Sequence, residues 1–226
     1  MKILEVVGLT CRAGAVTVLD ALSFTVEEGE IIALCGPAGA GKTACLRGLS
    51  GALPPGSGRL IFEGREVTGL RPRELAREGL VLAGELPGPP WSLTVGEAVA
   101  LALAWPHLGR LAALRAKWPD ARTRARVAAL LDRVGLAAER GRPRDGLRPA
   151  ALWRLEVAQA LALRPRLLLL DAPLGRLSPD ERPAAAALIS AMRAAGTTIV
   201  LTEREVTTAK IVADRVAALA RGRVVP

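Results

Sequence analysis

The amino-acid sequence predicts an α/β fold built on a largely parallel sheet, and three observations support this prediction. Apolar, strand-like runs alternate with helix-like segments along most of the 226 residues. One apolar run, Ile31–Cys35, leads directly into a glycine-rich loop. A second run, residues 167–170, consists of leucines, and continuous apolar runs of this kind are typical of strands buried on both faces. We therefore expect one α/β domain over residues 1–226.

The segment before the glycine-rich loop has the pattern of an antiparallel sheet. Apolar and polar residues alternate over residues 3–9, 16–19 and 22–26, as they do in half-buried strands. Residues 59–63 predict a further strand after the loop. Short strands that follow one another closely pair antiparallel, because a tight turn is enough to join them. We therefore expect an N-terminal antiparallel β subdomain beside the parallel core.

Helical periodicity dominates the middle of the chain. It runs from residue 94 to about residue 139 and is interrupted at Pro106 and Pro119. This pattern predicts an inserted helical subdomain at about 94–149. Shorter elements are expected on either side of it: helices over 43–49, 72–77, 150–163, 179–194 and 206–211, and strands over 79–83, 167–170, 197–201, 216–220 and 223–225.

The glycine-rich loop matches the phosphate-binding pattern G-x-x-x-x-G-K-[ST]. Its glycines let the chain curl so that successive amide groups point at phosphate oxygens. Lys42 can then reach the terminal phosphates, and the Thr43 hydroxyl can bind Mg²⁺. A chance match is the alternative, but the apolar strand before the loop and the helical segment after it argue against chance. The expected nucleotide-binding residues are Gly36, Pro37, Ala38, Gly39, Ala40, Gly41, Lys42 and Thr43.

Asp171 is the second candidate residue, because it ends the leucine strand. A carboxylate at the carboxyl end of a central strand in a nucleotide-binding fold is placed to hold Mg²⁺. The alternative is a turn or helix-capping aspartate before Pro173. We expect the metal site to consist of Thr43 and Asp171.

Composition narrows the classes of partner. The formal net charge of +9 rests almost entirely on arginine, with only four lysines. The arginines are dense only around residues 110–148, where Trp118 is the single aromatic residue and cannot form a stacking platform, so a nucleic-acid partner is disfavoured. The longest uncharged apolar run, residues 98–105, is too short to cross a bilayer, and Glu5 interrupts any leader-like run. We expect a cytoplasmic protein.

The order of these motifs resembles the ATP-binding subunit of ABC transporters. The phosphate loop, the helical insertion, Leu-Leu-Leu-Leu-Asp at 167–171 and Leu-Ser-Pro-Asp-Glu at 177–181 carry this resemblance. Residues 60–70 are most similar to subunits of branched-chain amino-acid importers. The resemblance implies a P-loop NTPase of the ABC ATPase type with a RecA-like sheet, and ATP and Mg²⁺ as cofactors. It also implies a second cassette subunit and transmembrane permease subunits, which would hold this chain on the inner face of the cell membrane. A periplasmic or extracellular solute-binding protein is implied indirectly.

Several catalytic positions of that family are substituted here. The glutamate expected after Asp171 is Ala172, and the switch histidine is Arg204. The signature motif Leu-Ser-Gly-Gly-Glu is replaced by Leu147, Arg148, Pro149, Ala150 and Ala151. Glu85 at the Q-loop position is a mild departure. These losses imply weak or no ATP hydrolysis, unless Glu203 or Glu205 substitutes for the missing groups.

Two further questions stay open at this point. The adenine-stacking aromatic residue of the family aligns with Ala13, and the neighbouring Arg12 could stack its guanidinium group instead. The alternative functions are a non-hydrolysing nucleotide sensor and a nucleic-acid-associated ABC ATPase. Steeply salt-dependent binding of DNA or RNA would favour the latter.

Overall fold

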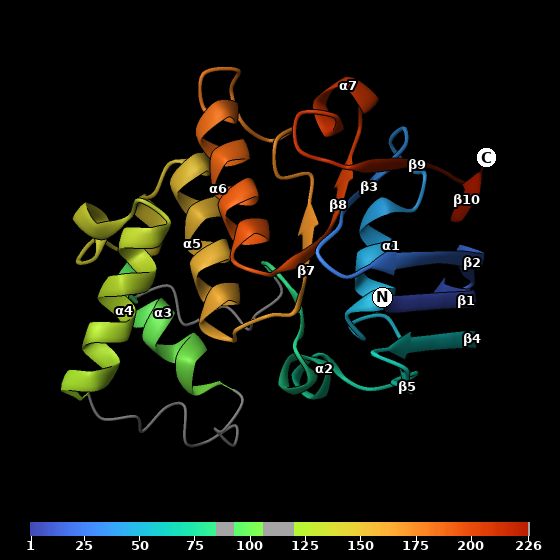
Figure 1. Ribbon diagram of the computed structural model, residues 1–226, viewed down its shortest axis with the longest axis horizontal. Coiled ribbons are helices and arrows are strands. Elements are labelled where there is room, and N and C mark those ends of the chain that lie inside the picture. The colour runs from blue at the N-terminus through green and yellow to red at the C-terminus, as the bar shows by residue number, and fades with distance from the viewer. Residues whose placement is uncertain (85–92, 106–119, 226) are drawn as a thin grey trace. The chain divides into compact units, whose positions relative to one another are not determined.

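The computed structural model describes residues 1–84, 93–105 and 120–225 (Figure 1). The chain forms two compact units. The first comprises Met1–Leu82 and Arg166–Pro226, and the second comprises Ala83–Pro165. Glu85, which stands at the predicted Q-loop position, lies outside the described residues.

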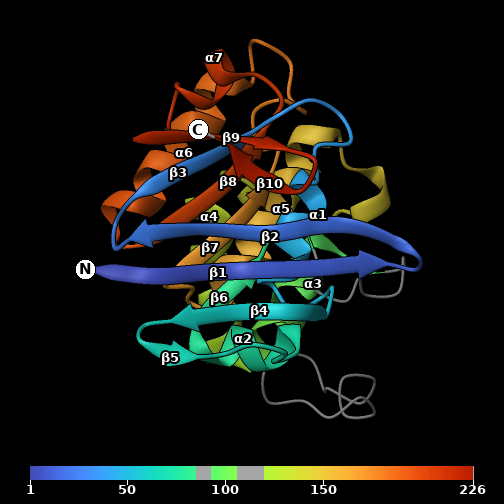
Figure 2. The same ribbon diagram turned by 90° about the vertical axis from the view of Figure 1, so that its right-hand side faces the viewer.

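The first unit contains a four-stranded antiparallel sheet in the order β2-β1-β4-β5, seen face-on in Figure 2. Its strands are β1 (Lys2–Ala13), β2 (Val16–Glu27), β4 (Pro55–Phe62) and β5 (Arg65–Glu66). The predicted antiparallel subdomain is therefore confirmed. The expectation of separate strands over 16–19 and 22–26 is wrong, because both belong to β2. Ala21 adopts φ 49° within β2 and its N–H donates to Thr10 Oγ1, which breaks the alternation without ending the strand.

The second sheet of this unit has six strands in the order β10-β9-β3-β8-β7-β6. Five of them run parallel, and only β10 pairs antiparallel, with β9. The bounds are β3 (Ile31–Cys35), β6 (Leu80–Leu82), β7 (Leu167–Asp171), β8 (Thr198–Glu203), β9 (Arg215–Ala220) and β10 (Arg223–Val225). This arrangement confirms the parallel core, and it brings the carboxyl ends of β3, β7 and β8 to one edge.

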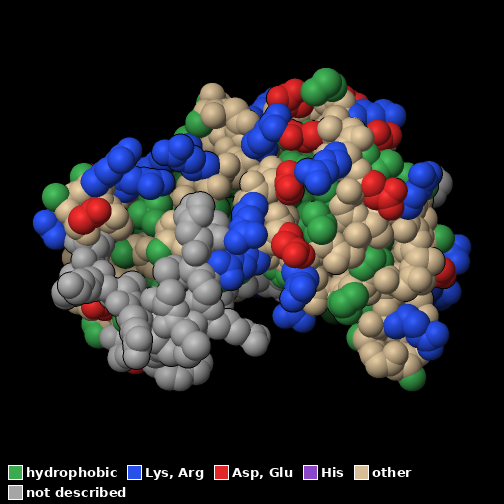
Figure 3. Space-filling view, turned by 90° about the horizontal axis from the view of Figure 1, so that it is seen from below, with side chains coloured by type: hydrophobic (Ala, Val, Ile, Leu, Met, Phe, Trp, Pro, Cys, Tyr) green, Lys and Arg blue, Asp and Glu red, His purple; other side chains and the backbone are tan. Residues whose placement is uncertain are grey.

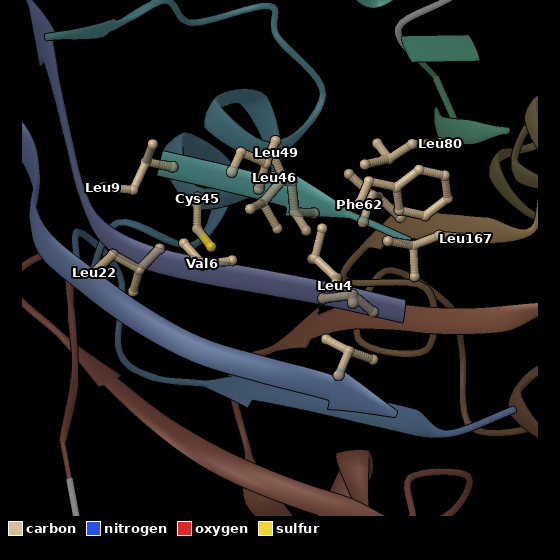
Figure 4. Packing of buried hydrophobic residues seen from close by; sticks show 14 of the residues in the cluster. Leu4, Val6, Leu9, Leu22, Cys45, Leu46, Leu49, Phe62, Leu80 and Leu167 are labelled. Atoms are coloured by element: carbon tan, nitrogen blue, oxygen red, sulfur yellow. The ribbon is translucent and has the colours of Figure 1, made fainter. Parts of the chain in front are cut away.

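Four helices belong to the first unit, and they are α1 (Lys42–Leu49), α2 (Pro72–Glu78), α6 (Arg182–Ala194) and α7 (Val206–Ala209). Helix α1 packs against both sheets and buries Leu46 and Leu49 in a core that Figure 4 shows. Helix α6 begins three residues later than expected. The Ser178 backbone N–H and hydroxyl both donate to the Glu181 carboxylate, and this forms a separate turn ahead of the helix.

The second unit is helical and contains α3 (Val95–Ala104), α4 (Ala121–Arg133), η2 (Ala137–Glu139), η3 (Arg144–Gly146) and α5 (Pro149–Ala162). A capping box of Thr94 and Glu97 starts α3, and Gln159 of α5 donates to the Ala98 carbonyl of α3 at 3.4 Å. The unit is wider than the helical insertion expected at about 94–149, because it also includes α5.

Two further observations concern the distribution of charge on the surface and the length of the helices. On the face shown in Figure 3, the Lys and Arg side chains lie in separate groups, with acidic side chains among some of them. Within the described part of the chain, no helix has both the length and the apolar character that crossing a bilayer requires.

Candidate nucleotide-binding site

The phosphate loop joins β3 to α1 at the carboxyl edge of the parallel sheet. The Gly36 N–H donates to the Glu203 carbonyl oxygen, which ties the loop to β8. A Cβ atom at Gly36 would lie 2.2 Å from the Leu219 carbonyl oxygen, so a side chain cannot be accommodated there without backbone movement. Gly41 has φ 99°, a left-handed conformation that glycine adopts without strain. The glycines of the motif are therefore needed both for close packing and for the turn.

The C-terminal hairpin supports this loop from the other side. The Gly222 N–H donates to the Ala40 carbonyl oxygen at 2.9 Å, and the Asp20 N–H donates to the Gly222 carbonyl oxygen at 3.1 Å. A Cβ atom at Gly222 would lie 2.5 Å from the Val18 carbonyl oxygen. Three segments that are distant in sequence, β2, the phosphate loop and the β9–β10 turn, are thus in direct contact.

The first turn of α1 has no side-chain cap. Its N-cap residue Gly41 has no side chain to cap the helix, and the first turn contains no acidic residue. The first amide groups of a helix lack intrahelical partners and carry the positive end of the helix dipole. The start of α1 can therefore bind an anion such as a phosphate group.

Lys42 lies over the loop that it follows. Its Nζ donates to the carbonyl oxygens of Gly36 at 2.6 Å and Pro37 at 2.7 Å. Within the described ranges Lys42 forms no ion pair with a carboxylate, so its charge is available to an anionic ligand. Phosphate oxygens can replace the two carbonyl groups as acceptors, with the advantage of opposite charge.

Asp171 and Thr43 lie together, although they are 128 residues apart in sequence. The Thr43 hydroxyl donates to Asp171 Oδ2 at 2.9 Å, and the Thr202 hydroxyl donates to Oδ1 at 2.7 Å. Neighbouring ligands of an octahedral Mg²⁺ ion, each about 2.1 Å from the metal, are about 3 Å apart. The separation of Thr43 and Asp171 fits that requirement. The capping alternative for Asp171 is not seen, because its contacts in the described part of the chain come from side chains.

Two residues near Asp171 were not anticipated from the sequence. Thr202 faces Asp171 because parallel strands β7 and β8 place the two residues in register. Arg176 Nη2 lies 3.4 Å from Asp171 Oδ2, the oxygen that also accepts from Thr43. Strand register could have indicated Thr202, since both strands were predicted, whereas Arg176 follows from a loop conformation that the sequence does not reveal.

The positions expected to hold catalytic groups are occupied differently. Ala172 has φ 47° and donates its N–H to Thr202 Oγ1, and its methyl group has no acid–base chemistry. Arg204 and Glu205 are exposed, and they line a cleft of about 840 Å³ that also reaches Gly36 and Pro37 of the phosphate loop. Arg204 therefore lies at the edge of the predicted phosphate site.

Glu203 is buried rather than presented to solvent. Its Oε1 accepts from the amide groups of Leu174 at 2.8 Å and Gly175 at 3.1 Å, while Oε2 is buried without a partner among the described residues. Burial raises the pKa of the Glu203 carboxyl, and the two amides oppose this shift. Glu203 thus holds the loop that follows Asp171, a structural role that the sequence did not suggest.

The segment aligned with the family signature begins helix α5 in the second unit. Arg148 is the N-cap residue, makes no capping hydrogen bond with its side chain, and is followed by Pro149 in the first turn. Pro149 has no N–H to offer to a ligand.

Arg12, which could stack on adenine, is held within the β1–β2 hairpin, where its Nη2 donates to the Ala15 carbonyl oxygen. Stacking of Arg12 on adenine stays a prediction.

Comparison with known proteins identifies the family. The sequence profile of the ABC transporter family matches residues 19–175. The phosphonates import ATP-binding protein PhnC of Rhodopseudomonas palustris (strain BisB5) is 32% identical, over 98% of this chain and 83% of that protein. The cobalt import ATP-binding protein CbiO of Rhodobacter capsulatus is 36% identical, over 93% of this chain and 72% of that protein.

A third relative is longer than this chain. The methionine import ATP-binding protein MetN of Mesorhizobium japonicum is 35% identical over 99% of this chain, which spans 59% of the length of that protein. These three relatives are named for phosphonates, cobalt and methionine, and none of the three for branched-chain amino acids.

Solved structures agree with the fold. An ATP-binding cassette of an ABC transporter in its ADP conformation has a TM-score of 0.87 at 23% identity, covering 100% of this chain and 90% of that one. A dimeric bacterial ABC transporter cassette has a TM-score of 0.84 at 21% identity, covering 99% and 97%. The predicted P-loop NTPase fold of the ABC ATPase type is confirmed, and the chain belongs to the ABC transporter family.

Proposed function

We propose that this chain is the ATP-binding subunit of an ABC importer and that it binds ATP at the phosphate loop. The observation that carries the proposal is the hydrogen bond between Thr43 and Asp171. This bond connects the start of α1 to the end of β7, and its two residues are the expected metal ligands. The open first turn of α1 and the free charge of Lys42 supply the donors that a triphosphate requires.

The residues present also suit Mg²⁺. Bound there with a nucleotide, the ion would neutralise part of the phosphate charge. Thr43 and Asp171 would hold it, and Thr202 would orient the Asp171 carboxylate through the bond to Oδ1. Lys42 would leave the Gly36 and Pro37 carbonyl groups and turn to the phosphates.

We further propose that hydrolysis is weak or absent. Ala172 cannot orient or deprotonate a water molecule, and Arg204 stays charged and cannot relay protons. Glu203 is a poor substitute, because it is buried and its Oε1 serves two backbone amides. Glu205 remains the exposed carboxylate nearest in sequence to the switch position. Losing one water-orienting or charge-stabilising group costs about a hundredfold or more in rate.

The proposed partners follow from the family. A second cassette subunit, homologous or identical, would face this one, and permease subunits would hold both on the inner face of the membrane. A solute-binding protein would act through the permease. For the solute, residues 60–70 favour the branched-chain amino-acid type, whereas the names of the relatives favour phosphonates, methionine or cobalt.

The first test is titration calorimetry of the purified chain with MgATP. We expect saturable binding at one site. Failure to bind MgATP would contradict the proposal directly.

The second test restores the missing groups. Ala172→Glu with Arg204→His is made with and without rebuilding residues 147–151 as Leu-Ser-Gly-Gly-Glu, and phosphate release is measured. We expect little ATPase activity before repair and a rise only when all three positions are repaired. High turnover by the unmodified chain would contradict the proposed loss of hydrolysis, and sensitivity of that turnover to Glu205→Gln would identify the substitute group.

A further inference from the structure

Arg176 places a positive charge at the predicted metal site, and the proposed binding of ATP does not by itself require this charge. Its Nη2 lies 3.4 Å from Asp171 Oδ2, and the Thr43 hydroxyl donates to the same oxygen. The Asp171 side chain is only 21% exposed, so few other groups can approach it. A guanidinium group therefore faces the carboxylate oxygen that a metal ion would share with Thr43.

The position of Arg176 is fixed by the loop that carries it. The amide groups of Leu174 and Gly175 donate to the buried Glu203 carboxylate, and the Leu174 and Leu177 side chains are buried on either side of Arg176. A Cβ atom at Gly175 would lie 2.6 Å from Glu203 Oε2, so this close packing requires glycine. The fold thus holds Arg176 near Asp171 through its neighbours as well as through its own charge.

Two cations cannot share one carboxylate oxygen without mutual repulsion. While Arg176 is paired with Asp171, this carboxylate attracts a divalent ion less strongly than an unpaired carboxylate would. The guanidinium group also presents several N–H donors, and such donors suit phosphate oxygens. One residue can therefore supply both neutralisation of Asp171 and positive charge toward a nucleotide.

We infer that Arg176 takes over part of the role of Mg²⁺ at Asp171, so that ATP binding by this chain depends less on divalent metal than it would without this guanidinium group. The inference rests on the proposed function, since it describes how the same site holds its nucleotide. A bland alternative is an ordinary surface ion pair with no effect on binding. The chain contains a suitable comparison, because Arg65 and Glu78 form an ion pair at the same 3.4 Å distance away from the phosphate loop.

The experiment measures ATP affinity of the whole chain by calorimetry, once with excess Mg²⁺ and once with EDTA. It compares the unmodified protein with Arg176→Ala, Arg176→Gln and the control Arg65→Ala. We expect the unmodified protein and Arg65→Ala to lose less than about threefold in affinity in EDTA. Both Arg176 variants should lose about tenfold or more, the factor expected for a missing charge-assisted hydrogen bond.

A second measurement follows the metal directly. The electron spin resonance signal of free Mn²⁺ reports how much ion is bound in the presence of ATP, and we expect tighter Mn²⁺ binding in Arg176→Gln than in the unmodified protein. Equal metal dependence in the unmodified protein and both Arg176 variants, whether strong or weak, would overturn the inference while leaving ATP binding intact. Absence of ATP binding under every condition would instead refute the proposed function. Circular dichroism melting curves confirm that each variant is folded.

Discussion

Helices α1 and α5 begin in the same way electrostatically, yet only α1 is built to receive phosphate. Neither N-cap residue, Gly41 or Arg148, makes a side-chain hydrogen bond to its helix, so in both helices the first turn is left without a side-chain cap. Before α1, glycines let the chain curl closely around a ligand. Before α5, Leu147 precedes Arg148, and Pro149 removes one amide and adds a ring. The loop that precedes the helix, rather than the helix dipole, separates the two sites.

The supports of the two segments differ as well. The phosphate loop is held by Glu203 of β8, by Gly222 and by the tight contact of Gly36 with Leu219. The segment before α5 is half-buried or exposed, and a Cβ atom at Gly146 would meet no atom within 4 Å. Substitutions in the first segment should therefore affect both folding and binding, whereas those in the second should have small effects on the isolated chain.

The largest expected effect is on ATP affinity. Lys42→Ala removes a charge-assisted contact worth about 1.5–3 kcal/mol, which corresponds to about a tenfold to hundredfold loss of affinity. Arg148→Ala at the start of α5 should leave the affinity of the isolated chain unchanged. Calorimetric titration with MgATP measures both variants. An equal loss in the two variants would remove the distinction between the helices.

The next effect is on stability. Gly36→Ala forces a methyl group against the Leu219 carbonyl oxygen and should cost about 1–3 kcal/mol, as overpacking usually does. Gly146→Ala, with no atom within 4 Å of the new Cβ, should change stability by less than about 0.5 kcal/mol. Urea denaturation followed by circular dichroism gives the two values. If Gly36→Ala is as stable as Gly146→Ala, the loop is less tightly packed than described.

Smaller effects on stability are expected when two alanines are replaced by glycine, and the two effects should have opposite signs. Ala172→Gly relieves a left-handed conformation and should stabilise the protein by about 1 kcal/mol. Ala150→Gly in the first turn of α5 should destabilise it by up to about 1 kcal/mol, because glycine loses more backbone entropy in a helix. Midpoints of urea unfolding test the signs. Two changes of the same sign would contradict the difference in backbone conformation.

The smallest expected effect is a pH dependence beside the phosphate loop. Burial raises the pKa of Glu203 in the folded protein, so the folded state binds its proton more tightly than the unfolded state does. The stabilisation linked to that proton is complete below the unfolded pKa of about 4.3 and is lost as the pH rises through the folded pKa. The unmodified protein should therefore lose stability relative to Glu203→Gln over this range.

Unfolding at several pH values measures this difference between the two proteins. Glu205→Gln is the control for the loss of one negative charge, because Glu205 is the exposed neighbour of Arg204. A gap between the unmodified protein and Glu203→Gln that stays constant with pH would show that the Glu203 carboxyl is not perturbed by folding.

Local patterns predicted the parts of this site that are local in the chain. The bounds of β3 were predicted as found, and α1 and β7 differ from the prediction by one residue, because apolar runs and a glycine motif define them. Thr202 and Arg176 were missed, and Glu203 was named only as a possible substitute catalytic group, not as the buried support of a loop. Each acts through strand register or through a loop held by a distant strand, and sequence periodicity carries no information about such contacts. The bend at Ala21 was misread as a strand end for a similar reason, since Thr10 of β1 stabilises it.

The contact of Gly222 with the phosphate loop has a consequence for synthesis of the protein. Ala40 leaves the ribosome long before Gly222, yet the loop gains a backbone hydrogen bond and a packing surface only when the later residue arrives. Nascent chains that stop before the β9–β10 turn should therefore lack a properly supported loop, and ATP can stabilise the polypeptide only after Gly222 has been synthesised. Stabilisation by the ligand thus has to wait until the β9–β10 turn has formed.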